Sequence, residues 1–181
     1  MSADRKAVLR KQALAARQQG GDGAALTRNL SAVLAPYAGQ IVAGYWPMRG
    51  EADPRPAMLA HDGPVCLPVV TGRAQPLIFR EWDGGDLVPG AYGTSHPADS
   101  SALLIPSVLI VPLAGFDRQG NRLGYGGGFY DRTLQVLRDQ GVAVAIGLAF
   151  AAQELSDIPA EQFDQPLDIV VTDKELIRPS H

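Results

Sequence analysis

The fold is decided by the stretch Val108-Leu-Ile-Val-Pro-Leu-Ala-Gly-Phe-Asp-Arg-Gln-Gly-Asn-Arg-Leu-Gly-Tyr-Gly-Gly-Gly-Phe-Tyr-Asp-Arg132. It opens with a short apolar run, 108–111, which predicts a buried strand that Pro112 closes. It ends where Asp131 begins a helical pattern, and Gly141 is placed to end that helix. A strand followed by a loop and a helix is typical of an α/β protein.

Of the glycines between this strand and this helix, five lie at positions 120, 124, 126, 127 and 128. Backbone N–H groups and the positive end of a helix meet in such a loop, which favours an anion site, and Arg122 and Arg132 can add bonds to phosphate oxygens. The loop is not a Walker A loop, and Phe129 stands where the dinucleotide pattern needs its last glycine. A flexible hairpin tip is the alternative, because adjacent glycines are ordinary there.

The run from Val111 to Arg132 resembles the signature of the 5-formyltetrahydrofolate cyclo-ligase family, also called methenyltetrahydrofolate synthetase. The resemblance extends from about Lys6 to Asp173 and is strongest over 109–132. It implies that ATP and 5-formyltetrahydrofolate react to give 5,10-methenyltetrahydrofolate, ADP and phosphate. Two alternatives stay open: a non-catalytic folate or nucleotide binder, and a sugar-phosphate isomerase that acts without ATP.

Length and composition predict one domain over 1–181. The net charge of −3 and the lack of a basic tract argue against nucleic acid as a partner. A lone cysteine, Cys66, excludes an internal disulfide and suits the cytoplasm. The first residues lead into a polar helix without an apolar signal core, and the uncharged segment 100–116 is too short to span a bilayer. We therefore expect a cytoplasmic protein without a membrane partner, and a monomer.

The expected architecture has three layers, in which helices cover both faces of a mostly parallel open sheet. The resemblance adds a similarity to the sugar-phosphate isomerase and CoA-transferase group. The patterns predict helices over 4–18, capped by Asp4, and over 24–35. They predict further strands over 40–46, 64–70, 76–82 and 142–150.

Lys6 and Arg10 lie four residues apart on the first helix and therefore share a face. From the residues alone, a solvated basic stripe is the simpler interpretation. The resemblance assigns this pair to the ATP phosphates instead. Arg5, Lys11 and Arg17 have no such support and are expected to be solvated.

The loop that starts at Pro47 follows the carboxyl end of a predicted strand, where open α/β sheets bind ligands. From the residues alone, Glu51 is a candidate helix cap. The resemblance makes it the residue that hydrogen-bonds the pterin end of the folate. Trp46 and Met48 are candidates for apolar contact with a flat ring, although Trp46 also suits the core.

The resemblance also assigns the remaining roles in phosphate and metal binding. It makes Arg122 catalytic and gives ATP contacts to Lys6, Arg10, Arg122, Gly124, Tyr125, Gly126, Gly127, Gly128, Phe129 and Tyr130. It places Mg²⁺ between Asp131 and Asp168, which suits an ion that binds a few carboxylates together with phosphates. From position alone, Asp131 is equally a helix cap. Gly127, Phe163 and the loop 94–97 depart from the residues that many family members carry.

Overall fold

The structure is a computed structural model that describes residues 2–141 and 143–180. Its helices are α1 (Ser2–Arg17), α2 (Gly23–Leu34), α3 (Arg55–Ala60) and α4 (Phe129–Gln140), and 3-10 turns lie at Ala35–Tyr37, Ala91–Gly93 and Ala151–Gln153. Its strands are β1 (Val42–Ala43), β2 (Val65–Val69), β3 (Ile78–Glu81), β4 (Val88–Pro89), β5 (Ser95–His96), β6 (Leu103–Leu104), β7 (Val108–Val111), β8 (Gly115–Phe116), β9 (Arg122–Leu123), β10 (Val144–Leu148), β11 (Ile169–Val171) and β12 (Leu176–Ile177). Within the described residues, no helix is both long enough and apolar enough to cross a membrane.

In the described part of the chain, eight strands form the main sheet in the order β12-β11-β10-β7-β1-β2-β3-β6. The central strands from β11 to β2 are all parallel. β12, β3 and β6 join at the edges in antiparallel pairs. The predicted mostly parallel sheet is therefore confirmed, although the strand within 76–82, β3, is antiparallel and lies between β2 and the edge strand β6.

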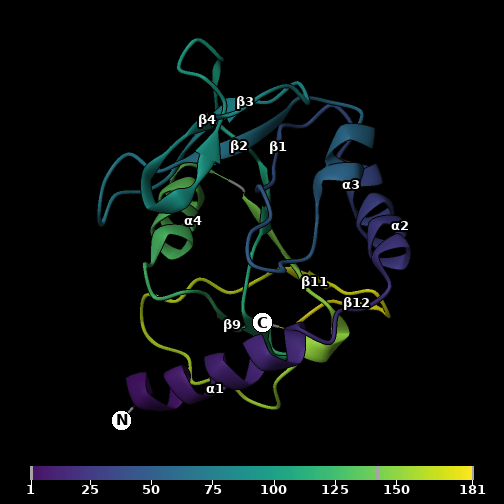
Figure 1. Ribbon diagram of the computed structural model, residues 1–181, viewed down its shortest axis with the longest axis vertical. Coiled ribbons are helices and arrows are strands. Elements are labelled where there is room, and N and C mark those ends of the chain that lie inside the picture. Colours follow the sequence, from purple (N-terminus) through teal and green to yellow (C-terminus); the bar gives the residue numbers. More distant parts are fainter. Residues whose placement is uncertain (1, 142, 181) are drawn as a thin grey trace.

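Helices lie on both sides of this sheet, with α4 on one side and α2 and α3 on the other (Figure 1). Successive side chains of a strand point to opposite faces of a sheet, and the central strands carry apolar residues on both faces, so each face needs helices to cover it. Val108 and Ile110 pack with the α2 side, whereas Leu109 and Val111 pack with Leu134 of α4. All four residues of β7 are buried, as the apolar run predicts.

α1 packs on the sheet's loops rather than on either face, beside the hairpin of β8 and β9 (Figure 1). Its contacts form a small third cluster of buried residues: Ala13, Ala114, Leu123, Leu155 and Ile158. The helix begins by Ser2, so the prediction that Asp4 caps it is wrong; Asp4 lies inside the first turn. This position of α1 brings its polar face to the end of the sheet where the glycine loop lies.

Other predicted boundaries shift for local reasons. The strand expected over 40–46 is limited to Val42–Ala43, because the chain then turns away and the Tyr45 hydroxyl donates to the Ala52 carbonyl. α4 begins at Phe129, two residues before the predicted start, because Gly128 adopts a left-handed φ of 69° and ends the loop there. In the strand expected over 142–150, Val142 lies outside the described residues, and β10 covers Val144–Leu148.

The long loop after β7 contains a short β-hairpin that was not predicted, because its many glycines indicate a loop rather than strands. β8 and β9 pair in antiparallel fashion, and the turn between them is built around Asp117, which is completely buried. The Asp117 carboxylate accepts the backbone N–H groups of Gln119, Asn121 and Ile158. This turn holds Arg122 at the start of β9, and the glycines 124–128 follow as a separate loop that leads into α4.

The order in which strands are added to the sheet reverses at β1, which pairs in parallel with β2 on one side and with β7 on the other. The loop after β1 and the loop after β7 therefore leave the same edge of the sheet from neighbouring strands. Such a switch point opens a crevice at the carboxyl ends of the strands, where α/β proteins bind ligands. Both loops singled out in the sequence meet at this crevice.

Candidate active site

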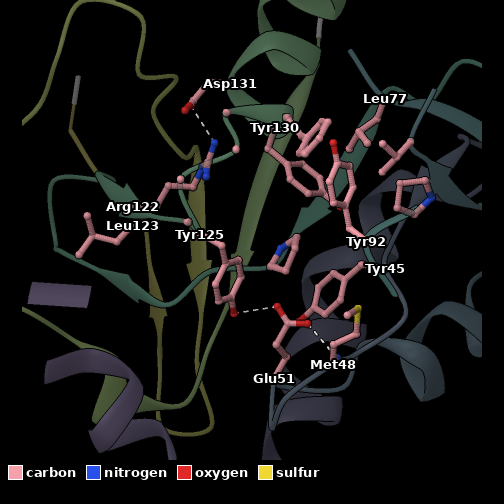
Figure 2. A pocket seen from close by; sticks show the side chains of 18 of the residues that line it. Tyr45, Met48, Glu51, Leu77, Tyr92, Arg122, Leu123, Tyr125, Tyr130 and Asp131 are labelled. Carbon is pink, nitrogen blue, oxygen red and sulfur yellow. Dashed lines mark hydrogen bonds and ion pairs between the residues drawn. The ribbon is translucent and has the colours of Figure 1, made fainter. Parts of the chain in front are cut away.

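A cavity of about 670 Å³ opens at this crevice. This volume is suitable for a ligand of the size of a nucleotide or cofactor. All the predicted site residues except Asp168 line it: Lys6, Arg10, Trp46, Met48, Glu51, Arg122, Gly124, Tyr125, Gly126, Gly127, Gly128, Phe129, Tyr130 and Asp131. Figure 2 shows the ion pair of Arg122 and Asp131 at one end of the cavity and Tyr45 beside Glu51 and Met48 at the other.

Arg122 is the buried cation of the cavity, with a side chain only 7% exposed. Its Nη2 donates to Asp131 Oδ1 at 2.7 Å, while its Nε is buried and has no hydrogen-bond partner among the described residues. Burial lowers the pKa of Arg122, and the nearby Asp131 carboxylate opposes this shift. A buried N–H group without a partner is costly, so this guanidinium is suited to binding an anion that completes its bonds.

Asp131 does not cap α4, so that alternative is wrong. The N-cap residue is Gly128, which has no side chain to bond the first turn, and Asp131 lies within that turn. Its Oδ1 accepts from Arg122 and from the backbone N–H of Gln165 at 2.9 Å. The carboxylate therefore lies beside the guanidinium at the edge of the cavity, where it can take part in binding a ligand.

The glycine loop, residues 124–128, is not a hairpin tip, since it connects β9 to α4 and lines the cavity. Gly126 and Gly128 have φ angles of 92° and 69°, which residues with a Cβ rarely adopt. The loop directs its backbone towards the N-terminus of α4, the arrangement that favours anions.

Two cationic side chains of α1, Lys6 and Arg10, are bound at this site rather than solvated. Lys6 Nζ lies 2.8 Å from Asp164 Oδ2 and 3.4 Å from Glu161 Oε2. Burial alone would lower the pKa of Lys6, but the two carboxylates raise it. Arg10 Nε donates to the Gly124 carbonyl at 2.7 Å, so it holds the start of the glycine loop. The solvated-stripe alternative is therefore wrong for this pair.

Glu51 has a defined position that excludes the helix-cap alternative. Its Oε1 accepts the backbone N–H of Met48 at 2.9 Å, and its Oε2 accepts the Tyr125 hydroxyl at 2.9 Å (Figure 2). The N-cap residue of α3 is Pro54, and it is Asp53, not Glu51, that accepts the N–H of Arg55 at the start of the helix. Burial raises the pKa of Glu51, and the bonds from Met48 and Tyr125 oppose that shift. The carboxylate can therefore present its remaining acceptor positions to a ligand with N–H groups.

Arg17 was expected to be solvated, and that prediction is wrong, because it is only 6% exposed. Its Nη1 donates to the Tyr125 hydroxyl at 2.5 Å and its Nη2 to the Arg49 carbonyl at 2.7 Å. The sequence carries one weak signal for this: Arg17 follows Ala13 by four residues, on the face that α1 buries. The partners themselves lie too far away in the chain to be predicted.

Trp46 both packs against the core and lines the cavity, the two locations that were considered for it. Its ring meets that of Trp82 edge to face at 6.0 Å, and the Arg55 guanidinium lies 4.3 Å from its centroid. It also lines the cavity beside Met48. The Trp46 ring thus adds an aromatic surface to the cavity lining beside Met48.

Asp168 lies apart from the cavity lining. Its Oδ2 accepts from Arg138 Nη2 at 3.0 Å and from the backbone N–H of Ala145 at 2.8 Å. Among residues 2–141 and 143–180, no group of three or more His, Cys, Asp and Glu side chains is arranged to hold a metal ion. Asp131 is bonded through Oδ1 and, among the described residues, not through Oδ2, which fits an ion that takes most of its ligands from phosphates and water. The assignment of Asp168 stays a prediction.

Comparison with known proteins supplies relatives of one kind. A family model described as "5-formyltetrahydrofolate cyclo-ligase family" matches residues 3–173. The chain is 49% identical over 65 residues to the 5-formyltetrahydrofolate cyclo-ligase of Haemophilus influenzae, which covers 35% of this chain and 34% of that protein. It is 34% identical over 118 residues to the protein of that name from Mycolicibacterium smegmatis, which covers 61% of this chain and 60% of that protein. The matched stretches thus span one third to three fifths of these curated relatives.

A solved structure extends the likeness to nearly the whole chain. The 5,10-methenyltetrahydrofolate synthetase of Aquifex aeolicus superposes with a TM-score of 0.75 at 28% identity, over 96% of this chain and 92% of that one. The structure of the synthetase from Mycoplasma pneumoniae, with a TM-score of 0.71 at 24% identity over 93% of this chain and 98% of that one, shows the same fold.

Proposed function

Since the chain belongs to the 5-formyltetrahydrofolate cyclo-ligase family, we propose that it cyclises 5-formyltetrahydrofolate to 5,10-methenyltetrahydrofolate at the expense of ATP, with release of ADP and phosphate. One observation carries the proposal: one cavity holds both the buried Arg122 guanidinium, whose Nε has no partner in the part of the chain that the structure describes, and the Glu51 carboxylate. A triphosphate fits the first and a ring with several N–H groups fits the second.

The chemistry accounts for the need to bring both substrates into one cavity. The oxygen of a formamide is a poor leaving group, so N10 cannot close the ring until that oxygen is activated. Transfer of the γ-phosphoryl group to the oxygen makes phosphate the leaving group; N10 then bonds to the formyl carbon and loses its proton. Such a transfer depends on positioning and charge neutralisation more than on covalent help from the protein.

The phosphates would lie against Arg122, Lys6 and the glycine loop. In the structure, Arg122 and Lys6 are paired with the carboxylates of Asp131 and Asp164. A bound triphosphate would compete with these carboxylates for the two cations. Arg10 would act by holding the Gly124 carbonyl, and so the loop, in place.

The folate ring would lie on the apolar side of the cavity. Glu51 would accept its N–H groups, and Trp46 and Met48 would contact its faces. Tyr130 lines the space between this side and Arg122. This order of side chains would place the formyl group between the two ends, near the γ-phosphate.

Mg²⁺ is part of the proposal, with Asp131 as the protein ligand and phosphate oxygens as the others. When bound, the ion would neutralise charge on the phosphates. Glu161 and Asp164 supply further carboxylates of the cavity lining. Asp168 would have to give up Arg138 to join the ion. A monomer in the cytoplasm stays a prediction.

The experiment is to incubate the purified protein with 5-formyltetrahydrofolate, ATP and Mg²⁺ and to follow near-ultraviolet absorbance, where the methenyl product absorbs and the substrate does not. We expect a rise that requires all three components and that ADP cannot support. A rise independent of ATP, or none with fresh substrate and metal, would contradict the proposal and favour an isomerase or a binder; the comparisons give no support to either alternative.

A further inference from the structure

Arg17, Tyr125 and Glu51 form a continuous hydrogen-bonded chain across the cavity. Arg17 Nη1 donates to the Tyr125 hydroxyl at 2.5 Å, and that hydroxyl donates to Glu51 Oε2 at 2.9 Å. Figure 2 shows the side chains of Tyr125 and Glu51 pointing towards each other. The three residues come from the end of α1, the glycine loop and the loop after β1, so these hydrogen bonds connect three separate parts of the site.

The positive charge of Arg17 fixes the direction in which the hydrogen bonds of this series are donated. A buried cation is costly unless an anion compensates it. Arg17 is 6% exposed, but its direct partners are two uncharged oxygens, the Tyr125 hydroxyl and the Arg49 carbonyl. The Glu51 carboxylate, one hydrogen bond further, is the negative charge at the end of the chain. The Tyr125 hydroxyl is therefore held between a cation that it accepts from and an anion that it donates to.

The glycine loop needs such a restraint. Four of its five residues lack a Cβ, and Gly126 and Gly128 have left-handed φ angles. Glycines lose more conformational freedom on ordering than other residues, so the loop is readily displaced unless it is held. Arg10 holds the loop by its bond to the Gly124 carbonyl, and the Tyr125 hydroxyl ties the loop to Glu51, which lies in the loop after β1.

We propose that Tyr125, held by Arg17, is a positioning residue that links the phosphate-binding loop to Glu51, so that the folate-binding carboxylate and the nucleotide site are energetically coupled. The inference rests on the proposed function, in which Glu51 binds folate and the loop binds phosphate. Its consequence is specific: a change at Glu51 alters nucleotide affinity without contact between Glu51 and the nucleotide. By thermodynamic linkage, the nucleotide alters folate affinity through the same residue.

The test is a double-mutant cycle on ADP affinity, measured by calorimetry with Mg²⁺ and without folate. ADP lacks the γ-phosphate that would meet the folate, so direct contact with Glu51 is avoided. The four proteins are the wild type, Glu51→Gln, Tyr125→Phe and the double variant. We expect Glu51→Gln to weaken ADP binding roughly three- to tenfold when the Tyr125 hydroxyl is present, because a bond to a charged acceptor becomes a bond to a neutral one. In the Tyr125→Phe background the same change should alter affinity less than twofold.

Tyr37→Phe is the matched control, because it removes a tyrosine hydroxyl from the 3-10 turn at 35–37, which does not line the cavity. It should leave ADP affinity unchanged. Melting temperatures of all variants verify that the fold is kept. Normal wild-type binding with an additive cycle would overturn the inference alone, since Glu51 and Tyr125 would then act independently. A wild type that binds neither ADP nor 5-formyltetrahydrofolate would overturn the proposed function and the inference together.

Discussion

Replacing Arg122 by methionine is expected to weaken ATP binding about a hundredfold while the fold persists. Methionine keeps a long unbranched side chain and removes the guanidinium. In the structure, Nη2 bonds to Asp131 at 2.7 Å and the buried Nε has no partner among the described residues. A phosphate that displaced the Asp131 carboxylate would take up two donors of this guanidinium. A hydrogen bond to a charged group contributes about 1.5–3 kcal/mol, and the loss of two imperfectly independent bonds gives about 3 kcal/mol, or roughly a hundredfold in affinity.

The free energy of unfolding should change much less than the binding free energy. Removing one partner of a buried ion pair often costs about 3–5 kcal/mol, because the other charge is left without compensation. Asp131, however, is 27% exposed and still accepts the N–H of Gln165, so water and that bond continue to solvate it. The buried cation, whose pKa burial lowers, is removed at the same time. We expect a change of about 1 kcal/mol or less, which corresponds to a melting temperature within about 4 °C of wild type.

Calorimetry with ATP and Mg²⁺, combined with thermal unfolding, measures both quantities. Arg122→Lys is the matched variant, because it keeps the charge but lacks the planar fork of donors, and it should recover part of the affinity. A methionine variant that binds ATP as tightly as wild type would refute the reasoning. So would an equal loss of ATP and folate affinity with a large fall in melting temperature, since that result indicates a damaged fold.

Three further predictions concern other side chains of the site. Arg10→Ala should weaken ATP binding about ten- to a hundredfold, because Arg10 holds the Gly124 carbonyl, and calorimetry should show unchanged folate affinity. Equal losses of affinity for both ligands would indicate a disrupted helix. Asp131→Asn should lower turnover at limiting Mg²⁺, with partial recovery at high Mg²⁺, whereas Asp168→Asn should lower the melting temperature slightly and keep turnover; the reverse pattern would assign the metal to Asp168. The melting temperature of Glu51→Gln relative to wild type should rise between about pH 4 and pH 7: burial raises the pKa of Glu51, so the contribution of the protonated carboxyl to stability is lost as pH rises through the raised pKa, and Gln does not titrate. Equal melting curves for both proteins across that range would show that Glu51 is not destabilised by its burial.

Much of the fold follows from local patterns, because the pattern and the packing agree. The apolar run at Val108–Val111 predicts β7 to the residue, since a strand buried on both faces has no polar positions. Gly141 ends the helix before it, as predicted, since its N–H bonds the Leu137 carbonyl at the end of α4. The antiparallel edge strands and the two-residue β1 were not predicted, because pairing partners and loop contacts distant in the chain decide them.

The parts of the candidate site that lie in short sequence motifs were predicted. The glycine loop, Arg122 and Glu51 lie in short stretches that follow strands, and the switch point of the sheet brings them together. Arg17 was missed, because a helical arginine is solvated unless distant segments close over it, and its partners lie 32 and 108 residues away in the chain. For Asp168, its position along the chain gives no indication that Arg138 binds its carboxylate.

The fate of the formyl oxygen tests the central claim most directly. The protein is supplied with ATP, Mg²⁺ and 5-formyltetrahydrofolate whose formyl oxygen is ¹⁸O, and the released phosphate is analysed by mass spectrometry. If the γ-phosphoryl group activates that oxygen, each turnover yields one ADP and one phosphate that carries the label. Methenyl product formed with unlabelled phosphate, or without ADP, would contradict the account.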